Sequence, residues 1–376
     1  MMKLQKNKKP LLYMQTAEKV KEEIRRRKLR SHDPVPSEGE LAELYSVSRM
    51  TAKLALEILA KEGIVYRLPR RGTFMAETQG DAAVQATVAE RSSKKRIAMI
   101  FPNLDDYTSS IIAAAEREAR NSDCYLIVRI STDREDESEC LQELYDDRVD
   151  GIILYPRGRT KCSEKVLSLN LLNYPLVIID RIFREVSIDC VYHDHYQGMY
   201  NMTEYLIDKG HKEIGYISMA FDGVTSREDR YKGYVQAMLD HGLPINSHNI
   251  LLQCTEDYMK NLSAPNPQLA KFIGDNPSLT AVVCTDDYLA TSCQYTAAYM
   301  NRSVPDQLSI VGFSDIQLAS LLPVPLTTAR QTTEQLGQSS VKLLLKRIEN
   351  SREGAITIKL NTSIIERSSV RMMQAE

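Results

Sequence analysis

Basic and hydroxyl side chains gather at the start of a predicted short helix near residue 50. Ser48 can act as the N-cap of this helix, which leaves Arg49, Met50, Thr51 and Lys53 near its exposed end. An arginine in that position can donate two hydrogen bonds to guanine O6 and N7, and Thr51 can contact a base edge or a phosphate. Lys53 is better placed for a phosphate. This chemistry indicates recognition of double-stranded DNA through the major groove.

Two short predicted helices would hold these side chains. Ser37 and Glu40 have the spacing of a capping box, so the first helix is expected to begin after Ser37. The second helix follows Ser48 and would turn five apolar residues inward: Ala52, Leu54, Ala55, Ile58 and Leu59. Two short helices joined by a tight turn, the second one led by Arg and Thr, predict a helix-turn-helix.

A two-stranded wing is expected to follow. Gly63 would end the second helix, Val65 would begin a strand, and residues 73–75 would return as its partner. Arg70 and Arg71 then lie at the wing tip, where they would enter the minor groove or contact its phosphates. The predicted DNA contacts are Glu38, Ser48, Arg49, Met50, Thr51, Lys53, Arg70, Arg71, Gly72 and Thr73.

The segment from about Leu12 to Ala76 resembles the winged-helix DNA-binding domain of the GntR family of bacterial regulators. One departure is Arg70, which replaces the first glycine of the family's wing, adding a charge and removing a flexible backbone position. The resemblance implies that residues 1–78 form a DNA-binding domain. The family pattern is met, in order, by Pro36-Ser37-Glu38, Leu41-Ala42, Val47-Ser48-Arg49, Thr51, Glu62-Gly63 and Gly72-Thr73-Phe74.

The charge distribution agrees with a DNA-binding end. The whole chain has 48 Lys and Arg against 50 Asp and Glu, a net charge of −2. Residues 1–78 hold 17 basic and 10 acidic residues, and the remainder holds 31 and 40, so the two parts carry +7 and −9. A small basic module on a large acidic one is typical of nucleic-acid binding at one end.

Length and composition argue against several further classes of protein. A chain of 376 residues is expected to hold two or three domains. No run approaches the roughly 18 apolar residues of a membrane span, and no apolar core follows the basic N-terminus, so we expect neither a membrane span nor a secretory signal. Seven scattered cysteines without a C-x-x-C pair favour reduced thiols in a cytoplasm over disulfides or structural zinc.

From Arg96 onward, short apolar runs alternate with amphipathic segments. Two such series predict an α/β core of two doubly wound parallel-sheet lobes after a linker at residues 79–94. We expect this core at residues 95–376. Its first lobe would comprise about 95–185 and 320–350, and its second lobe about 186–319 and 351–376.

This part, to about Ser369, resembles the sugar-sensing core of the LacI/GalR regulators. A GntR-type head on such a core is the arrangement of the arabinose repressors of Gram-positive bacteria. The resemblance implies an α/β fold akin to periplasmic sugar-binding proteins, and it implies that residues 95–376 form an effector-binding and dimerisation domain. The residues that carry it include Asp150-Gly151-Ile152-Ile153, Val177-Ile178-Ile179-Asp180-Arg181, Gly210-His211, Arg230-Tyr231-Lys232-Gly233-Tyr234, Thr285-Asp286-Asp287, Ser309-Ile310-Val311-Gly312-Phe313-Ser314-Asp315 and Pro325-Leu326-Thr327-Thr328 with Gln331.

Polar and aromatic residues just after the predicted strands are candidates for the effector site, because ligands of open α/β sheets bind outside the carboxyl ends of the strands. Arg230 lies on the family's Arg-x-x-Gly. Asp286 and Ser314 replace the family's usual asparagine and aspartate, so the pocket is expected to differ in detail. With no Trp in the chain, Tyr or Phe must supply the flat face for a sugar. The candidates are Asn103, Tyr107, Tyr155, Arg157, Asp180, Arg181, Phe221, Arg230, Asp286, Ser314, Asp315 and Gln331.

Other functions find less support. The run His193-Asp194-His195 is compatible with a metal site, but it is better explained as the start of a helix after a strand. No nucleophile elbow, P-loop or strand-associated G-x-G-x-x-G is present, so we expect neither an enzyme nor a bound cofactor. An exported sugar-binding receptor would fit the core, but not the basic head or the absent signal peptide.

The sequence therefore predicts a cytoplasmic, homodimeric transcriptional repressor that a small sugar releases from its operator. L-arabinose or a similar monosaccharide is the favoured effector, with a deoxyhexose or a purine as alternatives. Activation in place of repression remains open.

Overall fold

The computed structural model describes residues 12–27, 29, 32–68, 72–76, 94–157, 162–221, 223–255, 261–350 and 354–373. The chain divides into two compact units, Met1–Ser93 and Lys94–Glu376, here called the head and the core. Arg70, Arg71 and most of the predicted linker lie outside the described residues. No described helix combines the length and apolar character that crossing a bilayer requires.

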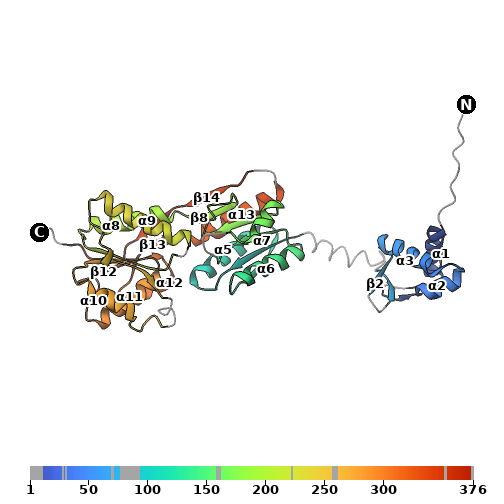
Figure 1. The fold of residues 1–376 in the computed structure, drawn as a ribbon, viewed down its shortest axis with the longest axis horizontal. Coiled ribbons are helices and arrows are strands. Elements are labelled where there is room, and N and C mark those ends of the chain that lie inside the picture. The colour runs from blue at the N-terminus through green and yellow to red at the C-terminus, as the bar shows by residue number, and fades with distance from the viewer. Residues whose placement is uncertain are drawn as a thin grey trace, which may run out of the picture. The chain divides into compact units, whose positions relative to one another are not determined.

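The head is a winged helix-turn-helix (Figure 1). Its strands form one antiparallel sheet in the order β1-β3-β2. This confirms the predicted fold of the N-terminal region. The elements are α1 (Leu12–Arg27), β1 (Pro34–Val35), α2 (Glu38–Tyr45), α3 (Arg49–Lys61), β2 (Val65–Leu68) and β3 (Gly72–Met75).

Both helices of the helix-turn-helix begin at the capping residues that the sequence indicates. The hydroxyl of Ser37 accepts the N–H of Glu40 at 3.3 Å, and the N–H of Ser37 donates to the Glu40 carboxylate at 2.7 Å. Ser48 Oγ accepts the N–H of Thr51 at 3.1 Å. Such caps satisfy donors that the first turn of a helix leaves free.

One residue of the predicted α3 core was placed wrongly. Leu54 was expected to point inward but is 38% exposed, whereas Leu56 is fully buried. Ala52, Ala55 and Leu56 follow the i, i+3, i+4 spacing of one helical face, and Leu54 lies about half a turn away from Ala52.

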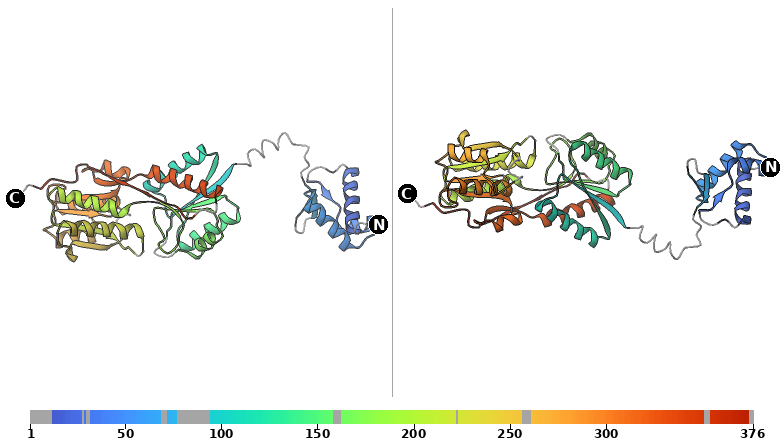
Figure 2. Two further views of the ribbon diagram at one scale, coloured as in Figure 1. Left: turned by 90° about the horizontal axis from the view of Figure 1, so that it is seen from above. Right: turned by 90° about the horizontal axis from the view of Figure 1, so that it is seen from below.

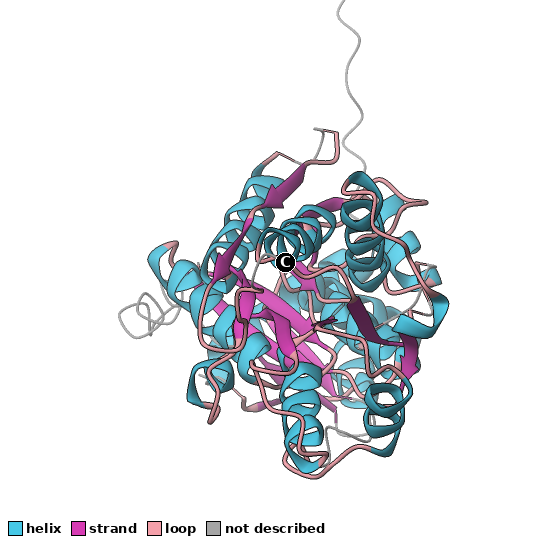
Figure 3. Cartoon of the chain, turned by 90° about the vertical axis from the view of Figure 1, so that its left-hand side faces the viewer, coloured by secondary structure: helices cyan, strands magenta, loops and turns pink. Residues whose placement is uncertain are grey.

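The core has two lobes, each built on a six-stranded, mostly parallel sheet with helices on both faces (Figures 1 and 3). The strand order in lobe 1 is β14-β8-β7-β6-β4-β5, and the order in lobe 2 is β10-β9-β11-β12-β13-β15. The two doubly wound sheets that the sequence predicts are therefore confirmed.

Lobe 1 contains β4 (Lys95–Phe101), α5 (Asp106–Asn121), β5 (Cys124–Ile130), α6 (Arg134–Asp146), β6 (Gly151–Leu154), α7 (Glu164–Leu171), β7 (Leu176–Ile179), β8 (Asp189–His193), α13 (Thr333–Glu349) and β14 (Thr357–Leu360). Alternate residues of β4 serve the two faces of its sheet. Ile97, Met99 and Phe101 pack in the cluster that contains α5 and α13, while Ala98 and Ile100 pack in the cluster that contains α6 and α7.

Lobe 2 contains α8 (His195–Asp208), β9 (Ile214–Met219), α9 (Thr225–Asp240), a 3₁₀ turn (Ser247–Asn249), β10 (Ile250–Cys254), α10 (Pro267–Asp275), β11 (Ala281–Cys284), α11 (Asp287–Tyr299), β12 (Ser309–Ser314), α12 (Gln317–Leu321), β13 (Thr327–Gln331) and β15 (Thr362–Ile365). Helices α8 and α9 share one apolar cluster with the sheet, and α10 and α11 share another. The seven cysteines of the chain are all unpaired.

Connecting segments pass between the two lobes of the core (Figure 2). The bounds of the elements and their sheets place the three crossings at single residues: Asp194, Thr332 and Asn361. The predicted lobe boundaries were therefore wrong in three places. Strand β8 pairs with β7 in lobe 1 and not in lobe 2, β13 belongs to lobe 2, and β14 belongs to lobe 1. The predicted boundary at residue 185 lies in a loop within lobe 1, and Arg347 of α13 holds the following strand through an ion pair with the buried Asp189 at 2.6 Å.

Close packing between α8 and α9 depends on Gly233. A Cβ at this position would lie 2.3 Å from the backbone oxygen of Tyr196. We expect Gly233→Ala to lower the free energy of unfolding by about 1–3 kcal/mol, because backbone atoms must move apart. Urea denaturation measures this change. Gly354→Ala is the matched control, since a Cβ there meets nothing within 4 Å, and equal stabilities of the two variants would contradict the prediction.

Candidate nucleic-acid interface and ligand site

The N-terminal end of α3 presents the side chains that the sequence predicts for DNA contact. Arg49 is exposed and makes no hydrogen bond or ion pair with any other described residue. Met50 is 62% exposed. Lys53 is also exposed, and its ammonium lies 4.0 Å from Glu57, a distance at which the pair contributes little. Arg49 and Lys53 are thus available to a ligand.

Two predicted DNA contacts have other roles in the structure. Thr73 is only 5% exposed, so its side chain is not presented to DNA in this structure, which gives its predicted DNA contact no support. Glu38 forms an ion pair with Arg67 of β2, a partner that sequence reasoning missed because it lies 29 residues away. Gly72 is exposed with φ of +117°, a conformation that favours glycine at the start of β3.

In the core, five of the predicted effector residues meet in one polar network: Tyr107, Asp180, Arg230, Ser314 and Gln331. The phenol of Tyr107 donates to Asp180 Oδ1 at 2.7 Å and accepts from Gln331 Nε2 at 2.8 Å. Gln331 Oε1 accepts from Ser314 Oγ at 2.9 Å and from Arg230 Nη2 at 3.2 Å. We call this set the interlobe network, since Tyr107 and Asp180 belong to lobe 1 and the others to lobe 2.

Chemistry determines the direction of every bond in this network. A guanidinium only donates, so the oxygen of the Gln331 amide must face Arg230 and its nitrogen must face Tyr107. Burial by itself raises the pKa of Asp180, but nearby His195 and Arg181 and the Tyr107 hydrogen bond lower it to about 2. The buried carboxylate of Asp180 and the buried guanidinium of Arg230 therefore lie at the two ends of a chain of hydrogen bonds that runs from one lobe to the other.

Arg230 is 7% exposed and has partners on every side. Its Nη1 donates to the backbone oxygen of Thr285 at 2.6 Å, and its guanidinium carbon lies 3.9 Å from the centre of the Phe313 ring. Phe313 thus supplies an aromatic ring beside the network, although it was not among the predicted effector residues.

Two histidines join the network, and sequence reasoning assigned them no such role. His193 Nδ1 accepts from Gln331 Nε2 at 3.2 Å, and its Nε2 lies 3.3 Å from Thr332 Oγ1. His195 contacts Arg230 and the backbone oxygen of Asp180. Burial lowers the pKa of His193 to about 4 and that of His195 to about 3, so both are neutral at pH 7. No group of three or more metal-ligating side chains occurs among the described residues.

Other predicted effector residues lie around the network. Arg181 stacks on Tyr155, with its guanidinium carbon 5.0 Å from the ring centre, and Arg181 Nε is buried without a partner among the described residues. Thr285 Oγ1 is buried and unsatisfied in the same sense. Phe221 is half-buried and packs on Tyr231. Such orphan polar atoms beside a network are what a bound polar ligand or water would satisfy.

Three more predicted residues serve mainly structural contacts. Asn103 is exposed and donates to Asp105 at 2.8 Å. The guanidinium of Arg157 donates to backbone oxygens of Ser131 and Pro102. Asp286 is the N-cap of α11, where its carboxylate accepts the N–H of Leu289 at 2.9 Å, and burial raises its pKa.

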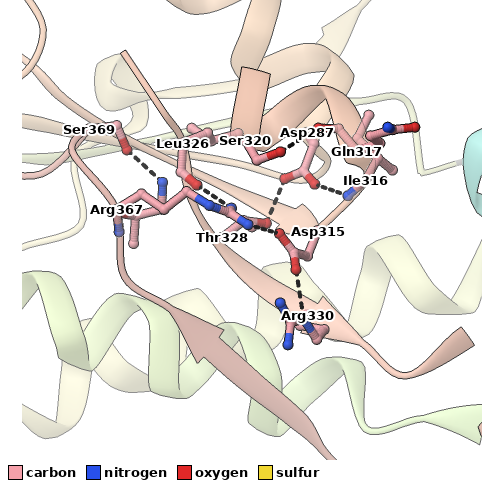
Figure 4. A network of polar contacts seen from close by, with 11 residues as sticks. Asp287, Asp315, Ile316, Gln317, Ser320, Leu326, Thr328, Arg330, Arg367 and Ser369 are labelled. Atoms are coloured by element: carbon pink, nitrogen blue, oxygen red, sulfur yellow. Dashed lines mark hydrogen bonds and ion pairs between the residues drawn. The ribbon is translucent and has the colours of Figure 1, made fainter. Parts of the chain in front are cut away.

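Asp315 is committed to ion pairs and is not free for an effector (Figure 4). Its side chain is 6% exposed and lies 2.6 Å from both Arg330 Nε and Arg367 Nη2. The prediction that Asp315 contacts the effector is therefore not supported. The sequence correctly predicts that Asp315 lies at the end of a strand. It could not predict the ion pair with Arg367, because Arg367 lies 52 residues away in the chain.

Asp287 lies in the same region and is completely buried (Figure 4). Its carboxylate accepts from Thr328 Oγ1 at 2.6 Å and from the N–H of Ile316 at 2.9 Å. Burial raises the pKa of Asp287 to about 7, although both hydrogen bonds oppose the rise.

This raised pKa predicts a pH-dependent contribution to stability. The pKa of Asp287 is about 7 in the folded state and about 3.9 for an unfolded aspartate. Its stabilising contribution is therefore full below pH ~4 and is lost as the pH rises to about 7. We expect the free energy of unfolding of the wild type, relative to Asp287→Asn, to fall across this range and to level off above it. Urea denaturation at several pH values measures the difference, and a constant difference would contradict the prediction.

Comparison with known proteins agrees with these two units. Residues 12–75 match the family model described as bacterial regulatory proteins, gntR family, and residues 203–370 match the model described as a periplasmic binding protein-like domain. The fold and the site thus define a class, bacterial regulators that join a winged-helix head to a two-lobed binding core.

Two similar proteins span nearly the whole chain. The arabinose metabolism transcriptional repressor of Geobacillus stearothermophilus is 30% identical over 343 residues, which cover 90% of this chain and 91% of the relative. The protein of the same name from Halalkalibacterium halodurans is 29% identical over 328 residues, 86% of this chain and 85% of the relative. The chain belongs to the family of these arabinose metabolism transcriptional repressors.

A solved structure shares the fold of the core. A LacI family transcriptional regulator from Enterococcus faecium with bound ribose has a TM-score of 0.64 at 23% identity, and the match covers 74% of this chain and 100% of that one.

Proposed function

We propose that this protein is a transcriptional repressor whose affinity for operator DNA is lowered when a small sugar, L-arabinose in the first place, binds between the two lobes of its core. The interlobe network carries this proposal. It places a buried carboxylate, a buried guanidinium and an aromatic ring together where two hinged lobes meet.

The chemistry of the network suits a polyol. The ionised Asp180 accepts hydrogen bonds from hydroxyl groups, and Arg230 donates to hydroxyl or ring oxygens. The half-buried ring of Phe221 can face the C–H side of a pyranose. Family membership favours arabinose, while the ribose bound to the Enterococcus faecium regulator makes D-ribose the second candidate.

Operator binding would use the exposed end of α3. Two heads of a homodimer in the cytoplasm would contact the half-sites of a pseudo-palindromic operator, with Arg49 reading bases and Lys53 contacting phosphate. The protein acts by binding and not by catalysis. By linkage, operator DNA must weaken sugar binding by the same factor by which the sugar weakens operator binding.

The test is an operator-release assay on the full chain. A high-affinity duplex is first selected from a random library, and its affinity is then measured with L-arabinose, D-ribose, L-fucose or hypoxanthine present. We expect L-arabinose to lower operator affinity by about 5–150-fold, the usual range of allosteric coupling. The sensing half of the proposal is wrong if none of these compounds changes the affinity. Failure to select any duplex would overturn the DNA-binding half.

A further inference from the structure

His195 connects the two ligand-binding ends of the interlobe network, and neither the family models nor the names of the relatives assign it a role. We propose that His195 is a positioning residue for effector binding, which orients the guanidinium of Arg230 and holds the backbone of Asp180 through a single neutral tautomer. This inference rests on the proposed sugar response.

The tautomer follows from the partners of the ring. Arg230 Nε and Nη2 lie 3.3 Å and 3.2 Å from His195 Nδ1. Because a guanidinium can only donate, Nδ1 must be the unprotonated acceptor. The proton of the neutral ring is then on Nε2, which donates to the backbone oxygen of Asp180 at 3.2 Å. A charged imidazolium would direct an N–H at the donors of Arg230, so this site requires the neutral ring.

On the lobe 1 side, the ring holds a residue in an unusual conformation. Asp180 has φ of +64°, the left-handed region that residues other than glycine rarely adopt. Its N–H donates to the backbone oxygen of Val191 at 3.0 Å, and its own backbone oxygen accepts from His195. Both backbone groups are therefore held, which directs the carboxylate toward Tyr107.

On the lobe 2 side, the ring completes the environment of Arg230. The guanidinium donates from Nη1 to Thr285 and from Nη2 to Gln331. It also stacks on Phe313, whose ring lies 5.9 Å from that of His195. Among the residues that the structure describes, only His195 accepts from both Nε and Nη2. Removal of this acceptor leaves two buried donors free and lets the guanidinium turn away from a ligand.

The place of His195 in the chain explains why its contacts depend on the positions of both lobes. It is the first residue of α8, immediately after the crossing at Asp194. A rotation of the lobes about the three crossings would move Asp180 relative to Arg230, and the imidazole contacts both. The imidazole therefore favours one relative position of the two lobes, the one in which the side chains of Asp180 and Arg230 face the same point.

The first arm of the test needs no effector. The chain holds six histidines, so ¹⁵N labelling of the imidazoles gives a spectrum that His195→Gln assigns by difference. We expect His195 in the full-length wild type at pH 7 to show the chemical shifts and couplings of the neutral ring protonated at Nε2. A ring protonated at Nδ1, or an imidazolium, would overturn the inference.

The second arm compares two substitutions. Glutamine keeps an acceptor and a donor at the end of the side chain, whereas leucine has neither. We expect His195→Leu to weaken L-arabinose binding by about 10–150-fold, the effect of losing a hydrogen bond to a charged group. His195→Gln should stay within about threefold of the wild type. His241→Gln is the control, because His241 is paired with Glu204 on the surface of lobe 2.

A merely structural role would give another pattern. In that case His195→Leu would lower operator affinity and melting temperature along with sugar affinity, and His195→Gln would not restore binding. Wild-type sugar affinity in His195→Leu, or equal losses in the leucine and glutamine variants, would overturn the inference. If the wild type itself binds no sugar, the proposed function fails, and the tautomer measured in the first arm still decides whether the geometry inferred for His195 is correct.

Discussion

Replacing Arg230 with alanine is expected to abolish release from the operator by sugar while leaving operator binding intact. Arg230 is buried, it is the cationic end of the interlobe network, and its Nη1 keeps one N–H beyond the bond to Thr285 that would donate to the effector. A hydrogen bond of this kind to a charged group contributes about 1.5–3 kcal/mol, so sugar affinity should fall by about 10–150-fold. Calorimetric titration with L-arabinose, together with the operator-release assay, measures both parts of the prediction.

Lys232→Ala is the matched control for this prediction. Lys232 lies on the same helix, but it is exposed, and its ammonium is 3.6 Å from Asp229. It should behave as the wild type does. Arg230→Lys separates charge from geometry, because lysine keeps the charge without the planar fork and should restore only part of the affinity. Release of Arg230→Ala from DNA at the wild-type sugar concentration would exclude the network as the sensing site.

The second large effect is expected at the DNA-binding end. Arg49→Ala should weaken operator binding by about 1–3 kcal/mol and relax the preference for guanine at one position of each half-site. The structure supports this expectation because the guanidinium is exposed at the start of α3 and has no partner among the described residues. Fluorescence anisotropy with the selected duplex and its single-base variants measures affinity and specificity together.

Lys53→Ala distinguishes base reading from charge. If Lys53 contacts a phosphate, its removal should weaken binding to all duplexes by a similar factor and reduce the slope of log K against log salt by about one. Sequence preference should not change. An Arg49→Ala variant that behaves in the same way as Lys53→Ala would show that Arg49 contacts the backbone and not a base.

The sequence by itself determined the elements and their order. Capping residues such as Ser37 and Ser48 act on donors within three residues, so local spacing was enough to locate α2 and α3. The apolar runs of β4, β6 and β7 required burial on both faces, which predicted two doubly wound sheets. Five effector candidates, at strand ends or on α5 and α9, lie next to one another as predicted, because parallel strands bring their carboxyl ends to one edge.

Tertiary structure alone decided which lobe each strand joins and what each polar group contacts. Strand pairing depends on partners far away in the chain, as with β8 and β14, whose 167-residue separation no local pattern can encode. For the same reason Asp315, a plausible ligand by its position, is held by Arg330 and Arg367. His195 resembles an ordinary helix start in the sequence, and it acquires a role only because folding brings Asp180 and Arg230 to the two nitrogens of its ring.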